Sequence, residues 1–506
     1  MAESRAIPQP TFDLPRSRWA ARAVLFGLGA IAGLGHAPFH LISATFVGFA
    51  FGLWFVAAAP TVRAAAARGW FFGAGYFLVT FNWLVEPFLV DIARHGVLAP
   101  FAILAMAGGL ALFWMAAAAL AARLFPPGAL RLAGLVLALT FAEWVRGWIL
   151  TGLPWGWPAY VWGESRMFLA LAWIGPLGLT LLTFALAALA GHLAQRRQTI
   201  PAVVVVGGLV WIGTQGFAPA DPPGGDRPMV RLVQSNAPQD EKWVPGKLEG
   251  FLQYQLDATA APGQPDLVVW SETSIPYRLS DAAPILRTLS VAAGGAPVLT
   301  GILRQGEAGW HNAMVLVEDG GAVTDLYDKV HLVPFGEYMP LNDFFAGLGI
   351  RGLADVIGGG FQSGEERRLI DVPGVGRVWP LICYEGVFPA EVGDWTERPD
   401  LIVLITNDAW FGRFSGPYQH LVQGRARAIE QGLPVVRVAQ TGVSAVIGPR
   451  GRLSGVIELG EAGFADAALP APAPLTLYAR TGDLPLLLML IVCTLSLLGL
   501  ARRKSD

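Results

Sequence analysis

The stretch Val378-Trp379-Pro380-Leu381-Ile382-Cys383-Tyr384-Glu385 joins an unbroken apolar run to three side chains that carry functional groups. A run that is apolar at every position is typical of a β-strand buried on both faces, in a sheet covered by helices. In open α/β sheets, binding and catalytic residues gather at the carboxyl ends of the strands. The stretch therefore predicts a strand over 378–382, with Cys383 at the edge where a site would lie.

Similar short runs, most of them continuously apolar, recur on both sides of this stretch and define a domain. They occupy residues 229–233, 266–270, 297–303, 314–317, 401–405 and 434–438. Polar stretches with helical character separate them, including 247–259 and 420–431. The alternation predicts an α/β domain over residues 229–483, preceded by a Pro/Gly/Asp-rich linker at 218–228.

The rest of the chain has the composition of a membrane protein. The sequence is 54% hydrophobic and only 15% charged, whereas globular chains carry about 25% charged residues. A membrane-spanning helix needs about 20 apolar residues. We expect a membrane domain over 1–217 with seven transmembrane helices, and a C-terminal transmembrane helix with a short tail over 484–506. The apolar stretches are 19–35, 41–59, 70–90, 98–122, 130–150, 166–194, 201–217 and 484–501.

The distribution of arginine residues between the two sides of the membrane predicts the orientation of these spans. With eight spans both termini share one side, and that side collects most of the arginines outside residues 218–483. The opposite short loops hold only Arg94 and Arg166. The positive-inside rule places both termini in the cytoplasm and residues 218–483 outside it. The net charge of −2 argues against a nucleic-acid partner.

The chain has two cysteines, Cys383 and Cys493. Cys493 lies within the last apolar stretch, so a disulfide between the two is not expected. No cysteine spacing indicates a metal site, and we expect no metal. A single cysteine in a polar domain is either a small buried hydrophobe or a nucleophile.

Two more strand ends carry groups that a cysteine nucleophile needs. Glu272 follows the run 266–270, and it is the candidate base for a thiol that is only slightly ionised at neutral pH. Attack on a carbonyl creates an oxyanion, which a lysine ammonium and the backbone N–H of Tyr384 would stabilise. Lys329 is the natural choice of lysine, because the other three lie near the linker or in the tail.

Each of these residues also has an ordinary structural interpretation. Glu272 could cap a helix, Lys329 could be a solvated surface charge, and Cys383 could be part of the core. All three interrupt apolar strand ends within distinctive motifs, and this joint occurrence favours a catalytic site.

The order Glu272, Lys329, Cys383 resembles the triad of the nitrilase (carbon–nitrogen hydrolase) superfamily. The fuller pattern is similar to the apolipoprotein N-acyltransferase family, including the spans, which soluble nitrilases lack. This resemblance covers nearly the whole chain and implies an αββα sandwich for the catalytic domain. The matching segments are YDKVHLVPFGEY at 327–338, CYE at 383–385, NDAWFG at 407–412, QHL at 419–421, 425–430 and TGVSAVI at 441–447.

The resemblance implies a reaction and its partners. Such an enzyme takes an acyl chain from a membrane phospholipid, with phosphatidylethanolamine as the expected donor, and transfers it to the N-terminal amine of a diacylglyceryl-cysteine lipoprotein. Cys383 would form a thioester, Glu272 would move the protons, and Lys329 would stabilise the oxyanions, without a cofactor. The implied location is a bacterial inner membrane, with a periplasmic catalytic domain and no need for more than a monomer.

Further positions match the family pattern. Glu337, Tyr384 and Glu385 are expected to support the active site, and Trp243, Asn312 and Trp155 are expected to contact substrate. The tryptophans have an alternative, because aromatic residues are common at membrane interfaces. Glu143 and Arg146, at i and i+3, suggest either a structural ion pair or a headgroup site. The Phe- and Trp-rich loops 341–356 and 409–418 are expected to flank an opening toward lipid.

Two other functions compete with acyl transfer. One is a membrane-anchored nitrilase-type amidase that uses the same triad and lets water finish the reaction. The other is a channel or transporter with an appended domain, which the scarcity of ionisable residues in the spans disfavours.

Overall fold

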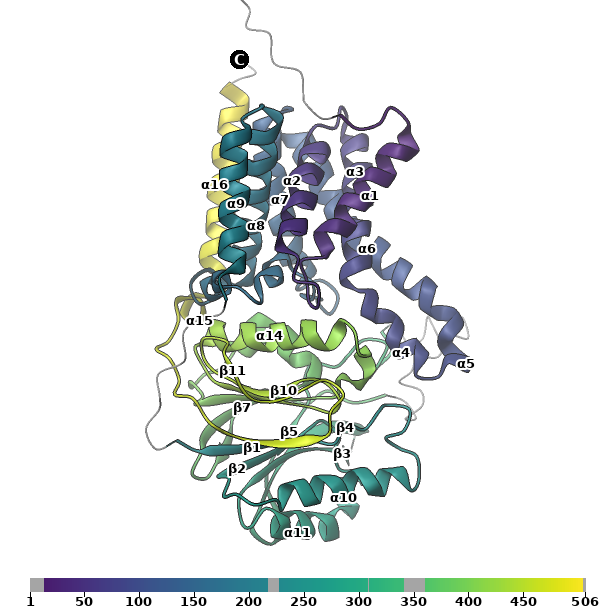
Figure 1. Ribbon diagram of the computed structural model, residues 1–506, viewed down its shortest axis with the longest axis vertical. Helices are drawn as coiled ribbons and strands as arrows, with labels where there is room; N and C mark the ends of the chain where they lie inside the picture. The colour runs from purple at the N-terminus through teal and green to yellow at the C-terminus, as the bar shows by residue number, and fades with distance from the viewer. Residues whose placement is uncertain (1–12, 217–226, 308, 341–359, 504–506) are drawn as a thin grey trace, which may run out of the picture. The chain divides into compact units, whose positions relative to one another are not determined.

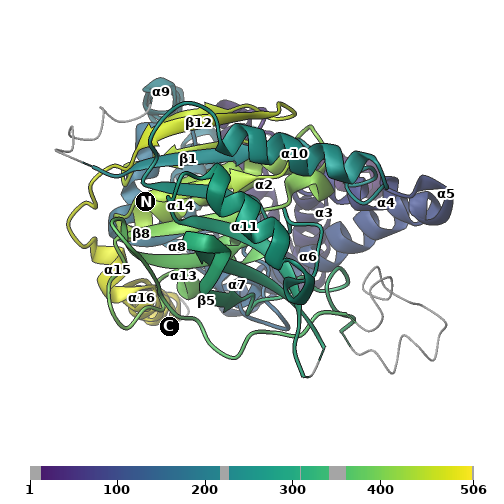
Figure 2. The same ribbon diagram turned by 90° about the horizontal axis from the view of Figure 1, so that it is seen from below.

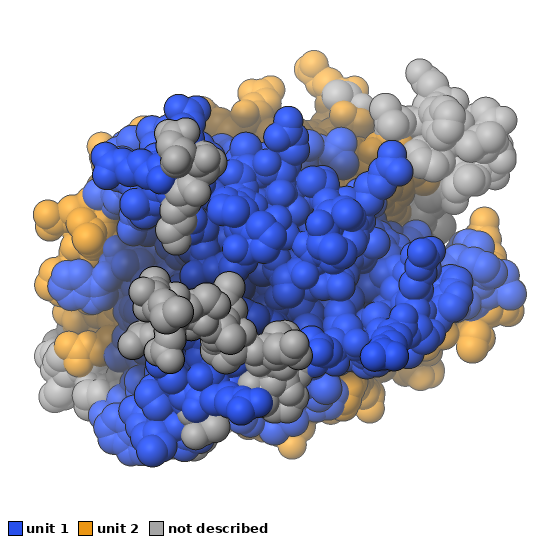
Figure 3. Space-filling model, turned by 90° about the horizontal axis from the view of Figure 1, so that it is seen from above, with its two compact units in different colours: residues 1–85, 95–217, 481–506 blue, residues 86–94, 218–480 orange. Residues whose placement is uncertain are grey.

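The computed structural model describes residues 13–216, 227–307, 309–340 and 360–503. The chain divides into two compact units, which Figure 3 colours separately. Residues 1–85, 95–217 and 481–506 make the first unit, and residues 86–94 and 218–480 make the second. The first unit is helical and the second contains both β-sheets.

The helical unit is a bundle of long apolar helices (Figure 1). Within it, α3 packs against α1 and α6, and α7 packs against α6 and α16. A Cβ added to Gly29 or Gly75 would overlap a backbone carbonyl of the facing helix, so small residues permit the close approach of α1 and α3. The helices are α1 (Arg18–Gly33), α2 (Ile42–Ala57), α3 (Val62–Thr80), α6 (Ala99–Leu124), α7 (Ala129–Arg146), α8 (Leu171–Gln195), α9 (Thr199–Thr214) and α16 (Leu484–Arg503).

Three helical stretches in the described part of the chain are long and apolar enough to cross a membrane. They are Ile92–Leu124, Arg166–Gln195 and Leu484–Arg503, and shorter apolar helices include Ile42–Ala57. The number of crossings therefore stays a prediction. The stretch expected at 70–90 differs from α3, which ends at Thr80. The short helices η1 (Asn82–Val85), α4 (Glu86–Leu89) and α5 (Ile92–His95) follow it.

The second unit is built on two six-stranded sheets. The first has the order β12-β1-β2-β3-β4-β5, and the second has the order β11-β10-β9-β8-β7-β6. In each sheet three central strands are parallel and the outer pairings are antiparallel. The strands are β1 (Met229–Gln234), β2 (Leu267–Trp270), β3 (Val298–Gln305), β4 (Trp310–Glu318), β5 (Ala322–Asp328), β6 (Ile370–Val372), β7 (Gly376–Ile382), β8 (Leu401–Thr406), β9 (Val435–Ala439), β10 (Ser444–Ile447), β11 (Leu453–Ile457) and β12 (Gly463–Ala468).

The sheets pack face to face, and helices cover their outer faces. One apolar cluster joins the two sheets, with Leu232 and Leu299 from one sheet and Val378 and Val403 from the other. A second cluster lies between the first sheet and helices α10 (Lys247–Thr259) and α11 (Ala283–Ala292), which Figure 2 shows together over that sheet. A third cluster lies between the second sheet and helices α13 (Pro389–Val392) and α14 (Gly416–Gln431). The layers form the predicted αββα sandwich.

The apolar runs predicted the buried central strands, and the structure confirms each of them. Five strands were not predicted: β5, β6, β10, β11 and β12. In β11 and β12 side chains alternate between exposed and partly buried positions, as expected near the edges of sheets that face solvent. Helix α10 occupies the predicted residues, whereas α14 begins four residues earlier than expected, with Pro417 in its first turn.

Candidate active site

The candidate nucleophile, Cys383, lies directly after β7 in a strained backbone conformation. Its φ is 53°, and it begins the short 3-10 helix η8 (Cys383–Val387). A positive φ is uncommon for a residue with a Cβ, and it persists where the surrounding structure enforces it. Only 6% of Cys383 is exposed. The turn places a buried thiol at the carboxyl edge of the second sheet.

Glu385 ties this turn to the loop that follows β5. Its Oε2 accepts a hydrogen bond from the backbone N–H of Ile382 at 2.8 Å. Its Oε1 accepts from the Tyr327 hydroxyl at 2.7 Å and from the Val330 N–H at 2.8 Å. Burial raises the pKa of Glu385, and these donors oppose that rise because they stabilise the ionised carboxylate. Its contacts therefore anchor the nucleophile turn.

Glu272, the candidate base, is held on both oxygens. It follows β2, and its Oε1 accepts from the Asn312 side-chain amide at 2.7 Å. Its Oε2 accepts from the backbone N–H of Asn407, also at 2.7 Å. Strand β3 passes so close that a Cβ on Gly301 would overlap the backbone nitrogen of Thr273. Glycine at that position thus permits the turn that carries Glu272.

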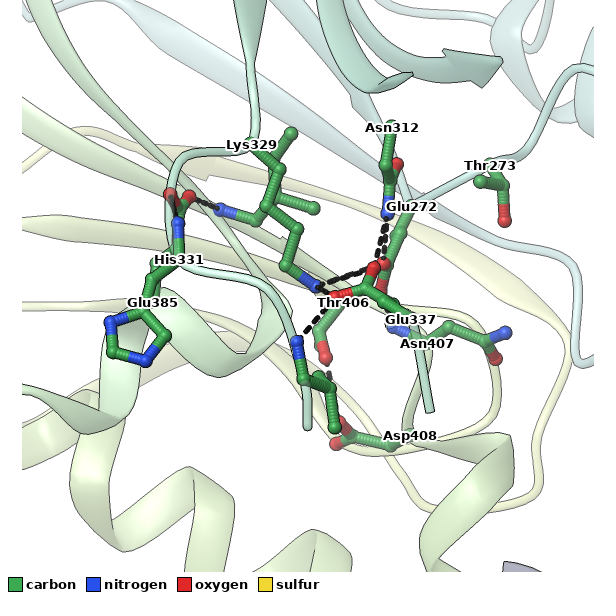
Figure 4. Close-up of polar contacts among 12 residues, drawn as sticks. Glu272, Thr273, Asn312, Lys329, His331, Glu337, Glu385, Thr406, Asn407 and Asp408 are labelled. Atoms are coloured by element: carbon green, nitrogen blue, oxygen red, sulfur yellow. Dashed lines mark hydrogen bonds and ion pairs between the residues drawn. The ribbon is translucent and has the colours of Figure 1, made fainter. Parts of the chain in front are cut away.

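Lys329 lies between two carboxylates, as Figure 4 shows. Its Nζ is 2.9 Å from Glu337 and 3.7 Å from Oε1 of Glu272, and only 1% of its side chain is exposed. Burial lowers the pKa of Lys329, but Glu337 and Glu272 outweigh this effect, so the net shift is upward. The lysine therefore stays an ammonium, which is the form that can stabilise an oxyanion.

The thiol of Cys383 is neutral at rest. Burial and the negative charge of Glu272 raise its pKa, while Lys329 and a hydrogen bond with the Thr406 side chain lower it by a smaller amount. A thiol in this environment needs a base at the moment of attack. The neighbouring carboxylate and ammonium can supply proton transfer and charge stabilisation at one place.

A buried polar cluster supports Thr406, and the sequence indicated it only through the NDAWFG and QHL motifs. Asp408 Oδ1 accepts from the Thr406 hydroxyl at 2.8 Å and lies 2.9 Å from Nδ1 of His420. Arg437 forms an ion pair with the other oxygen of Asp408. His420 also makes a hydrogen bond with the backbone of Cys383. Through His420, the cluster thus contacts the backbone of the nucleophile.

The other predicted residues are placed as follows. Glu337 contacts Lys329 and accepts from the Val333 N–H at 2.7 Å. The ring of Tyr384 packs on His331, with ring centres 5.4 Å apart. Asn312 donates to both Glu272 and, at 3.3 Å, Glu337, so it lies within the site.

Trp243 and Trp155 differ in their surroundings. Trp243 is 43% exposed and lies beside Lys242 in the second unit. Trp155 is 1% exposed in the helical unit, where its ring lies 4.6 Å from that of Trp83 and its carbonyl accepts from Arg146. Arg146 pairs with Glu143, so this pair has a structural role in the bundle.

Two loops were expected to flank an opening toward lipid. Loop 341–356 lies outside the described residues. In loop 409–418, the side chain of Phe414 is 54% exposed. No cluster of three or more His, Cys, Asp and Glu side chains suited to a metal ion occurs within the described ranges.

Models of known protein families match both the N-terminal and the C-terminal half of the chain. The family model for carbon–nitrogen hydrolases matches residues 229–472, and the model for the apolipoprotein N-acyltransferase N-terminal domain matches residues 28–190. The apolipoprotein N-acyltransferase of Rhodopseudomonas palustris is 37% identical, over 96% of each chain. That of Bradyrhizobium diazoefficiens is 36% identical, over 94% of each chain.

Solved structures are also similar to part of the chain. A carbon–nitrogen hydrolase superfamily protein from Xanthomonas campestris covers 52% of this chain and 97% of its own, with 23% identity and a TM-score of 0.37. The relatedness rests on the sequence matches, which extend over nearly the full length of both proteins. The chain is an acyltransferase and belongs to the apolipoprotein N-acyltransferase family.

Proposed function

We propose that this enzyme N-acylates lipoproteins in two steps, with a phospholipid as the acyl donor and a Cys383 thioester as the intermediate. The observation that carries the proposal is the convergence of Cys383, Glu272 and Lys329 at the carboxyl ends of strands from both sheets. Membership of the family supports lipid and lipoprotein substrates and a membrane setting.

The first step is acylation of the enzyme. Glu272 takes the thiol proton from Cys383, and the thiolate attacks the ester carbonyl of the phospholipid. Lys329 and the N–H of Tyr384 stabilise the tetrahedral oxyanion. The carbon–oxygen bond of the ester breaks, the leaving alkoxide takes the proton from Glu272, and a lysophospholipid departs.

The second step is transfer to the lipoprotein. The N-terminal amine of the diacylglyceryl-cysteine attacks the thioester carbonyl, and Glu272 accepts a proton from that amine. The carbon–sulfur bond then breaks and an amide remains on the lipoprotein. The thiolate recovers its proton from Glu272, so the enzyme returns to its starting state.

Asn312, Trp243 and Trp155 complete the proposal as substrate-contacting residues. Asn312 is supported by its buried carbonyl oxygen, which has no hydrogen-bond partner among the described residues and can accept from the incoming amine. Trp243 is supported by its exposed ring. Trp155 rests on the family pattern alone.

We propose a monomer with eight spans in a bacterial inner membrane, with both termini in the cytoplasm and the catalytic domain in the periplasm. The arginine distribution supports this orientation of the spans. Cysteines introduced one at a time at Arg63 and Arg94, into a background with Cys383→Ala and Cys493→Ser, can be labelled with a membrane-impermeant maleimide in whole cells. Labelling at 94 and protection at 63 is expected, and the reverse pattern contradicts the topology.

Intact-mass spectrometry tests the proposed function. The purified protein is incubated with phosphatidylethanolamine, beside a Cys383→Ala variant whose folding is checked by thermal unfolding. The wild type should gain one acyl chain that hydroxylamine removes, and the variant should gain none. A folded wild type that stays unmodified while it hydrolyses short amides would instead favour the amidase.

A further inference from the structure

A second lysine, Lys242, lies at the active site and was not expected there. Its position in sequence, close to the linker, was the reason to prefer Lys329 as the catalytic lysine. In the structure it is only 6% exposed and lies in the segment between β1 and α10. Its Nζ donates to the backbone carbonyl of Glu272 at 3.2 Å and to the Thr273 hydroxyl at 2.7 Å. Both lysines nearest Glu272 are therefore buried, but they contact different parts of it.

These two acceptors belong to a strained turn. Thr273 has a φ of 46°, in the left-handed region that residues with a Cβ rarely adopt. Such a conformation is strained and persists only when contacts around it enforce it. The ammonium of Lys242 is such a contact, because it bonds the carbonyl of the peptide that joins Glu272 to Thr273 and also the Thr273 side chain.

The same segment reaches Glu272 by a second route. Gln239 accepts a hydrogen bond from the side chain of Asn407 at 2.8 Å. The backbone N–H of Asn407 in turn donates to Oε2 of Glu272 at 2.7 Å. Residues 239–242 therefore hold Glu272 through its main chain and, by way of Asn407, through its carboxylate.

The exposed ring of Trp243 lies next to the Lys242 ammonium. The Nζ of Lys242 lies 5.4 Å from the centre of the Trp243 ring, within cation–π range, and the tryptophan is 43% exposed. The tryptophan therefore connects the buried ammonium with the surface of the second unit. This gives a physical route from an exposed side chain to the base.

We propose that Lys242 is a positioning residue for Glu272, which it holds in the geometry for proton transfer and links to the exposed ring of Trp243. This inference rests on the proposed thioester chemistry. Burial lowers the pKa of Lys242 to about 8, and attraction to Glu272 opposes this shift. The amine is therefore charged at neutral pH and loses its proton within an accessible range.

The test compares Lys242→Met with a matched control, Lys247→Met, in which the replaced lysine is half exposed and pairs with Glu241. The rate of acyl-enzyme formation from phosphatidylethanolamine is measured by rapid quench and mass spectrometry. We expect Lys242→Met to lower the maximal rate about 10- to 100-fold with little change in half-saturating lipid concentration, because a small displacement of a catalytic group has such an effect. Lys247→Met should match the wild type.

A pH profile separates positioning from a general loss of folding. The titratable groups around Lys242 are Glu272 from the β2 turn, Lys329 and Glu337 beyond it, and Asp240 and Glu241 on its own segment. The wild-type rate should fall as pH rises through about 8, because a neutral amine donates weaker hydrogen bonds. Lys242→Met should lack this inflection, and Lys242→Arg should retain charge and move the inflection to higher pH.

The outcomes are distinct. A folded Lys242→Met protein with wild-type rate and pH profile overturns the inference. If that variant unfolds, Thr273→Val removes the shorter of the two bonds, and an unchanged rate and profile in Thr273→Val overturns it equally. A wild type that forms no acyl-enzyme refutes the proposed function itself, before the lysine variants are compared.

Discussion

The ammonium of Lys329 lies 2.9 Å from Glu337 and is thus closer to this carboxylate than to Glu272, at 3.7 Å. Glu337 therefore carries most of the pairing with the lysine, which leaves Glu272 available to exchange protons. Glu385, by contrast, accepts from backbone N–H groups of the nucleophile turn and of the loop after β5. The two supporting carboxylates have different roles, and different variants distinguish them.

Glu337→Gln should reduce the rate of acyl-enzyme formation about 100-fold, because Lys329 would shift toward Glu272 and the reacting groups would lose their alignment. Loss of this buried ion pair should also lower thermal stability, so the rate is compared at a temperature where thermal unfolding shows that the variant is folded. Rapid-quench measurement of the acyl-enzyme checks this, with the exposed Glu366→Gln as control. A rate equal to that of the control would contradict the assigned role.

Glu385→Gln should mainly lower the stability of the folded protein. An amide would present N–H groups to the backbone donors that now surround the carboxylate, so we expect unfolding to become easier by about 1–3 kcal/mol. Denaturant unfolding of the catalytic domain within the full-length protein measures this change. Full stability together with lost activity would instead indicate a direct part in catalysis.

Gly301→Ala should disturb the turn that carries Glu272. The new Cβ would overlap the backbone nitrogen of Thr273, which we expect to cost about 1–3 kcal/mol of stability and to reduce activity. Gly250→Ala in α10 is the matched control, because its Cβ would meet no atom within 4 Å. That variant should gain about 0.5–1 kcal/mol from helix propensity. Equal effects at the two positions would refute the argument.

The Asp408 cluster predicts an acid sensitivity. Burial raises the pKa of Asp408, but Arg437 and His420 lower it by more, from 3.8 to about 2. Because the folded pKa lies below the unfolded one, the ionised group stabilises the fold above about pH 4, and this contribution, roughly 2 kcal/mol, is lost as the pH falls toward 2. Asp408→Asn should remove that dependence.

Unfolding measured between about pH 2 and 6 tests this prediction for Asp408. The exposed Asp371→Asn serves as control and should keep the wild-type pH dependence. A wild type and an Asp408→Asn variant with parallel curves would show that the cluster contributes no charge-dependent stability.

Much of the fold could be predicted from local pattern. The central strands are largely apolar because both of their faces are covered, so β8 and residues 378–382 of β7 were recognisable as unbroken runs. The edge strands β11 and β12 were missed, because side chains that face solvent need not be apolar and short alternating patterns resemble loops. Glu272 and Cys383 were found because each follows an apolar run, whereas Lys329, which follows the partly exposed strand β5, was found through its motif.

The sequence by itself determined the fold class, the family and the chemical types present at the site, since these depend on residue identity and on spacing along the chain. Only the tertiary structure decided which groups meet. Lys242 contacts the Glu272 turn, and Asp408 joins Arg437, 29 residues away in sequence. Such contacts depend on strand register and on turns with positive φ, which bring distant segments within hydrogen-bond range. Neither residue type nor local spacing encodes those distances, because they arise from packing of the whole domain.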